Sequence, residues 1–178
     1  MRMFVRAAAA AAFAILVFGG VLLRSEENLR IVPFISGDRV VVSFELNDAY
    51  NDAVREAIAS GLRTTFSYDL ELRARAWVDR TIGTAVVATT DRYENLTRRH
   101  TLTRTIDGRL DDVLVTEDDA VVKAWLTKWN RVPVADTSRL DPAREYYVRV
   151  TTHAQPVGGS LLGVTKSITG QVKFTFVP

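Results

Sequence analysis

Hydrophobic and polar residues alternate over several short stretches of the chain, a pattern typical of β-strands that bury one face. The clearest stretch covers residues 65–76, in which Phe66, Tyr68, Leu70 and Leu72 alternate with polar or charged neighbours. Similar stretches predict further strands at residues 29–36, 39–46, 82–90, 98–106, 113–115, 145–155 and 167–177. Most of these segments are short and end at turn residues, so the chain is predicted to be rich in antiparallel strands.

Two segments change to the spacing of amphipathic helices. Residues 48–60 place apolar side chains on one face and end at Gly61. A second helix is predicted to begin at Thr116, and we expect Trp125 and Trp129 to lie on its apolar stripe. A parallel sheet would need a helix after nearly every strand, so many strands with two helices favour an antiparallel arrangement. We therefore expect a mainly β fold: an antiparallel, immunoglobulin-like sandwich of two sheets with two short helices.

The N-terminus has the pattern of an export or anchor segment. Residues 7–23 carry no charge, and Arg2 and Arg6 precede them. Cleavage at the best signal-peptidase position would leave an apolar stretch on the mature chain, so an uncleaved hydrophobic helix is favoured and a cleaved signal followed by secretion is the alternative. The leading arginines keep the N-terminus in the cytoplasm. We thus expect residues 1–25 to anchor in a bacterial inner membrane and residues 26–178 to form one domain in the periplasm.

Charge and cysteine content exclude several classes of function. The formal net charge is +2, but Arg2, Arg6 and Arg24 precede any acidic residue, so the remaining chain is nearly balanced. This balance argues against nucleic-acid binding driven by net charge. The chain has 0 cysteines, which excludes disulfides, thiol catalysis and thiolate metal sites.

The residues with catalytic or metal-binding chemistry form no recognised motif. His100 and His153 lie in different predicted strands without the spacing of a metal motif, so both are interpreted as structural or rim histidines. A glycine-containing segment before Lys166 resembles a phosphate loop, but the lysine does not directly follow Gly163 and a strand follows instead of a helix. We expect no catalytic residues, no metal, no cofactor and no enzymatic activity.

One local excess of positive charge is a candidate binding surface, formed by Arg92, Arg98, Arg99 and Arg104. Guanidinium groups bind phosphate and carboxylate through paired hydrogen bonds, so these arginines could contact a protein partner of the envelope or membrane, an anionic lipid or an acidic glycan. The alternative interpretation is a solvated pair of strands.

Several short motifs recur in the order known from one bacterial family. They are Trp77 with Asp79, Arg92-Tyr93-x-x-Leu96-Thr97-Arg98, residues 118–125, Val134-Ala135-Asp136 and Leu140-x-Pro142-x-x-x-Tyr146. Over residues 40–152 the chain therefore resembles domain-of-unknown-function family 4390. The resemblance implies an N-terminal export or anchor segment and one mostly β envelope domain, and it implies no catalytic residues. Two departures are His100, where an aromatic residue is usual, and Ala143 after Pro142.

These observations predict a membrane-anchored binding or accessory module of the cell envelope. Two alternatives stay open. One is a hydrolase of envelope material that uses carboxylates on a wet strand face, such as Asp69 and Glu71, which are neighbours on one side of a strand. The other is a sensory domain that acts through a partner.

Overall fold

The computed structural model describes residues 28–157 and 167–177. The predicted N-terminal hydrophobic helix and most of the predicted connection between the last two strands lie outside the described residues. Among the residues that are described, no helix has the length and apolar character needed to cross a membrane.

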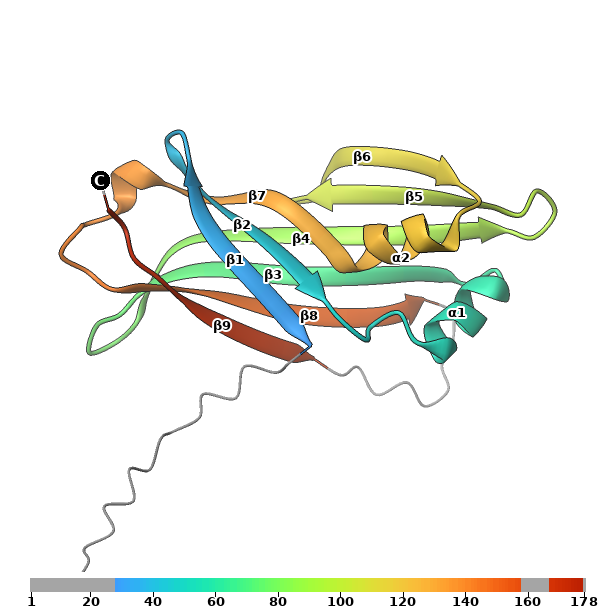
Figure 1. Cartoon of the computed structure of the whole chain (residues 1–178), viewed down its shortest axis with the longest axis horizontal. Helices are drawn as coiled ribbons and strands as arrows, with labels where there is room; N and C mark the ends of the chain where they lie inside the picture. The colour runs from blue at the N-terminus through green and yellow to red at the C-terminus, as the bar shows by residue number, and fades with distance from the viewer. Residues whose placement is uncertain (1–27, 158–166, 178) are drawn as a thin grey trace, which may run out of the picture.

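Within the described part of the chain, the strands form two antiparallel sheets that pack face to face (Figure 1). The smaller sheet has the order β1 (Leu29–Ser36), β2 (Arg39–Leu46), β7 (Lys128–Asp136). The larger sheet has the order β6 (Arg109–Thr116), β5 (Arg99–Ile106), β4 (Arg80–Glu94), β3 (Arg63–Ala74), β8 (Tyr146–Val157), β9 (Ile168–Phe174). The prediction of a mainly β fold with two antiparallel sheets is confirmed, whereas the immunoglobulin-like strand order stays a prediction.

The two predicted helices are present, and both are shorter than predicted. The first, α1 (Asp52–Ala59), begins where the Asn51 side chain accepts a hydrogen bond from the Val54 backbone N–H at 3.1 Å. The second, α2 (Asp119–Thr127), begins at Asp118, which caps it in the same way. These caps satisfy amide groups that have no partner within the helix. A short 3-10 helix, η1 (Thr137–Arg139), follows β7.

The prediction that Trp129 lies on the second helix is wrong. The helix ends at Thr127, Lys128 is already extended, and Trp129 pairs with Phe44 of β2 across the smaller sheet. Strand β7 had no clear signal in the sequence, because Arg131 adopts a positive φ of 57° and the register with β2 shifts twice, which breaks the apolar alternation. Pairing with β2 therefore overrides the local helical pattern.

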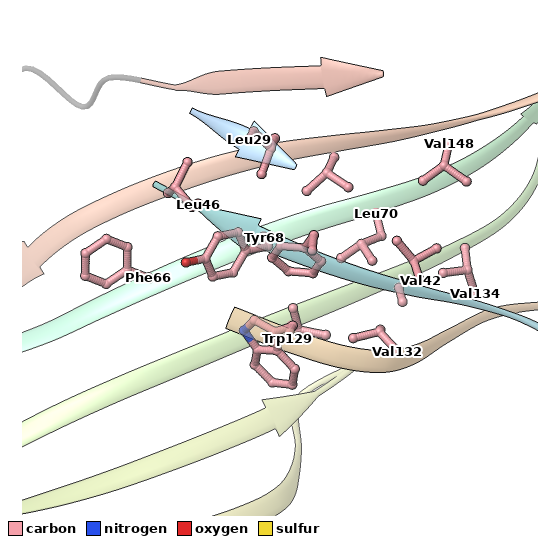
Figure 2. Close-up of a cluster of buried hydrophobic side chains, with 14 of the residues drawn as sticks. Leu29, Val42, Leu46, Phe66, Tyr68, Leu70, Trp129, Val132, Val134 and Val148 are labelled. Carbon is pink, nitrogen blue, oxygen red and sulfur yellow. The ribbon is translucent and has the colours of Figure 1, made fainter. Parts of the chain in front are cut away.

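The core lies between the two sheets (Figure 2). The alternating residues of β3 point inward as predicted, and Tyr68 at the centre packs its ring against Phe44 at 4.8 Å between centroids. The Tyr68 hydroxyl donates a hydrogen bond of 2.7 Å to the backbone carbonyl of Leu126. A buried hydroxyl needs such a partner, so this bond fixes the end of α2 over the larger sheet.

The sheets approach each other closely where β7 crosses β4. A Cβ atom added at Gly83 would lie 2.2 Å from the backbone oxygen of Val134, so only glycine permits this contact.

The outward face of the larger sheet is more polar than the face that packs on the smaller sheet. Along β3 it carries polar and charged residues that are only partly buried, including Asp69, Glu71 and Arg73. This face is wet, as the alternation predicts.

Candidate functional site

The structure places three of the four predicted binding arginines, Arg92, Arg98 and Arg99, on the surface at one end of β4 and β5. Arg98 lies in the turn with a φ of 57°, and Arg99 forms an ion pair of 3.0 Å with Glu117. Both partners of that pair are more than half exposed, so the pair contributes little to stability.

Arg104 also lies on β5, but its side chain is on the opposite face of this strand from that of Arg99. Its guanidinium stacks on Trp125 at 4.3 Å and on Trp129 at 4.7 Å from the ring centroids. It also donates hydrogen bonds to the backbone oxygens of Trp125 at 2.9 Å and Lys128 at 2.6 Å, where α2 ends. Burial lowers the pKa of this guanidinium. Arg104 therefore holds α2 against the sheet and does not share a surface with the other three arginines.

Both histidines pair with an aspartate, in contrasting surroundings. His100 Nδ1 lies 2.9 Å from the carboxylate of Asp91, which is fully buried, and the imidazole stacks on Tyr93. His153 Nε2 lies 3.1 Å from Asp69 on the outward face, where both side chains are more than one-third exposed. The described residues contain no group of three or more His, Asp or Glu side chains placed to hold a metal ion.

The buried pair belongs to a polar group under the two helices. Asp91 Oδ1 has no hydrogen-bond partner among the described residues. Burial raises the pKa of Asp91, and the nearby charge of Asp119 raises it further, while the hydrogen bond with His100 acts against both. Tyr50 donates its hydroxyl to Asp119 at the start of α2, and burial together with this bond raises the pKa of the phenol. Tyr50, Asp91 and His100 are buried, whereas Asp119 lies at the surface.

The residue that is most out of place for a folded domain is Trp77. It lies in the turn between β3 and β4, at the opposite end of the larger sheet from α1 (Figure 1). Its relative exposure is 102% and that of the adjacent Val78 is 76%. A tryptophan normally hides most of its ring, so the full exposure of a tryptophan beside an exposed valine is unusual for a folded domain.

Hydrogen bonds hold the backbone on both sides of Trp77, so this exposed side chain lies in an ordered turn. We call residues 75–79 the Trp77 turn. Asp79 accepts a hydrogen bond of 2.7 Å from the Tyr147 hydroxyl and one of 3.4 Å from the Ala76 amide. The hydrogen bond from Tyr147 is the main reason why the pKa of Asp79 is lowered. The Arg75 amide is bonded to the Glu145 carbonyl at 2.8 Å.

The sequence contained part of the signal for this site. Trp77 and Asp79 belong to the motif that carries the family resemblance, and the apolar alternation of the strand stops just before them, which places a large aromatic residue in a turn. The hydrogen bond from Tyr147 that holds Asp79 was not predictable from the sequence, because Tyr147 lies 68 residues further along the chain than Asp79.

The comparisons with known proteins identify a family without an assigned activity. The sequence model described as "Domain of unknown function (DUF4390)" matches residues 27–155, which is most of the chain. No curated protein matches the chain, and no solved structure does.

Proposed function

We propose that this chain, which belongs to the DUF4390 family, is a binding module that contacts a protein partner of the cell envelope through the Trp77 turn. The observation that carries the proposal is the complete exposure of Trp77 on a turn whose backbone is held by hydrogen bonds. The proposed role is binding and not catalysis. The proposal thus adds Trp77, as a specific contact residue, to the predicted binding or accessory module.

The energetics favour Trp77 as the centre of an interface. Tryptophan is among the residues most enriched at positions where truncation costs about 2 kcal/mol or more of binding energy. Its ring can remove about 200 Å² of its own surface from water. Because the bonds from Tyr147 and Ala76 to Asp79 already order the turn, binding has little backbone entropy left to lose.

The proposed setting follows from the leader. Residues 1–25 have the sequence pattern of an anchor whose N-terminus stays in the cytoplasm, which supports a periplasmic location for a β domain anchored in a bacterial inner membrane. In that setting the partner is another envelope protein. The arginines Arg92, Arg98 and Arg99 are a second, weaker candidate surface, since they are exposed and could contact an anionic lipid or glycan.

The test is site-specific photo-crosslinking in cells with the full-length, C-terminally tagged chain. A photoreactive phenylalanine analogue replaces Trp77 in one strain and Leu96 in another. Leu96 is a matched control because it is 94% exposed in a different turn, between β4 and β5. We expect one recurrent protein to crosslink at position 77 and not at position 96.

The dependence on the side chain is tested with the native residues. The same protein should co-purify with the wild type and with Leu96→Ala, and its recovery should fall at least about tenfold with Trp77→Ala. Undiminished recovery with Trp77→Ala would contradict the proposal. Crosslinking of position 77 to lipid alone would replace the protein partner with a membrane surface.

A further inference from the structure

A surface cavity of about 340 Å³ opens beside the Trp77 turn, between the start of β4 and the connection from β7 to β8. Both segments lie at the same end of the larger sheet (Figure 1). The cavity is lined by Arg80 and Thr81 of β4, by Arg139, Asp141 and Arg144 of the connection, and by Tyr146 at the start of β8.

Positive charge dominates this cavity. Three guanidinium groups face one carboxylate, and that carboxylate is already engaged, since Asp141 accepts from Arg144 Nε at 3.3 Å and from the Ala143 amide at 2.9 Å. The side chains of Arg80 and Arg139 make no hydrogen bond or ion pair with any described residue. Two guanidinium groups at one cavity thus have no ion-pair partner in the described part of the chain.

Hydrogen bonds fix the wall of the cavity formed by the connection. The Tyr146 hydroxyl accepts from the Asp141 amide at 2.7 Å and donates to the Asp141 carbonyl at 3.3 Å. The Leu140 amide bonds to Thr137 at 2.9 Å, and the Thr137 amide bonds to Asp38 at 2.8 Å. The arginines therefore project from a fixed backbone, which reduces the entropy lost when they bind a ligand.

A second cavity provides an internal comparison. It measures about 480 Å³ and lies at the turn between β5 and β6, where Arg109 is accompanied by Asp107 and Asp111. There the carboxylates outnumber the arginine, so an anion would be repelled. Among these two cavities, only the one beside the Trp77 turn has the charge that an anion requires.

We infer that the cavity lined by Arg80, Arg139 and Arg144 binds a phosphate group. Guanidinium forks from β4 and from the connection approach the space from different sides, which suits the several oxygens of a phosphate better than the two of a carboxylate. The group could belong to a small phosphate ester or to a phospholipid headgroup. This inference goes beyond the contact proposed for Trp77, because an anion can occupy the cavity whether or not the turn holds a partner.

The test uses the full-length chain in a neutral detergent, titrated calorimetrically with inorganic phosphate against a sodium chloride blank at matched ionic strength. We expect saturable binding by the wild type. Arg80→Ala and Arg139→Ala should each weaken it at least about tenfold, since each removes a charge-assisted pair of hydrogen bonds. Arg109→Ala is the matched control and should bind like the wild type. All three residues are exposed, so the variants are expected to fold.

A second arm identifies the source of the phosphate. Phosphatidylglycerol mixed into the micelles should weaken the apparent affinity for inorganic phosphate if the headgroup occupies the cavity, and should leave it unchanged if the natural ligand is a soluble ester. Either result supports a phosphate site. Absence of saturable binding by the wild type, or equal binding by Arg139→Ala and Arg109→Ala, overturns the inference and leaves the proposal for Trp77 untouched, because that proposal is judged by protein recovery.

Discussion

The two ends of the larger sheet hold similar side chains in opposite environments. At the helical end, the ring of Tyr50 and the carboxylate of Asp91 are buried, and the ring of Tyr93 is partly buried against the core. At the other end, Trp77 is fully exposed. At the first end, buried polar groups such as Asp91 and His100 bond to each other inside the fold. At the second end, the hydrogen bonds of Asp79 order a turn that exposes the apolar ring of Trp77 to solvent.

The contrast separates residues that stabilise the protein from residues that are available for contact. A buried carboxylate is tolerated only with partners, so the group around Asp91 is costly to disturb. A fully exposed tryptophan contributes almost nothing to stability. The two ends should therefore respond very differently to substitution, and the free energy of unfolding measured in urea is the quantity to compare.

The largest effect is expected where β7 crosses β4. Gly83→Ala would bring a methyl group to 2.2 Å from the Val134 oxygen, and a backbone atom cannot move aside without separating the sheets. We expect a loss of about 4 kcal/mol or more in the free energy of unfolding. Gly170→Ala is the control, because its nearest neighbour, at 2.9 Å, is the end of the flexible Leu29 side chain. Equal losses for the two variants would show that the sheets are not locked at Gly83.

The next effect compares the two histidine–aspartate pairs. His100→Ala leaves the carboxylate of Asp91 buried without its partner, and we expect a loss of about 3 kcal/mol in urea unfolding near neutral pH. His153→Ala breaks a pair of the same chemistry on the exposed face, and a loss below about 1 kcal/mol is expected. Similar losses for both variants would remove the distinction between buried and exposed polar groups on which the comparison rests.

A smaller effect concerns pH. Burial raises the pKa of Asp91 in the folded state, so the native protein holds this proton more tightly than the unfolded chain does. The stability from this group is complete below the ordinary aspartate pKa of about 4 and is lost as pH rises through the raised value. The Asp91→Asn variant is the reference, because the asparagine amide at this position does not titrate. The wild type should thus lose stability relative to this variant as the pH is increased from about 4, and parallel pH profiles would contradict the assignment.

The sequence predicted most of the sheet, because the alternation along β3 and its neighbours depends only on which face is buried. The same alternation contained information about Arg104, which has the parity of Leu102 and so points inward. Strand β7 was missed because its pairing with β2, not its own pattern, determines its structure. The arginines of the cavity were missed because Arg80 and Arg139 meet only through the tertiary fold.

The smallest effect on stability is expected at Trp77, and it is the sharpest test of the comparison. Trp77→Ala removes a side chain that is fully exposed, so the free energy of unfolding should change by less than about 0.5 kcal/mol. Trp129→Ala is the matched control, since that ring is only 2% exposed, and about 3 kcal/mol should be lost. A stable Trp77→Ala protein that no longer recovers its partner would assign the exposed ring to binding. A large loss of stability would instead mean that the ring packs against the fold in solution, and the two ends would no longer differ.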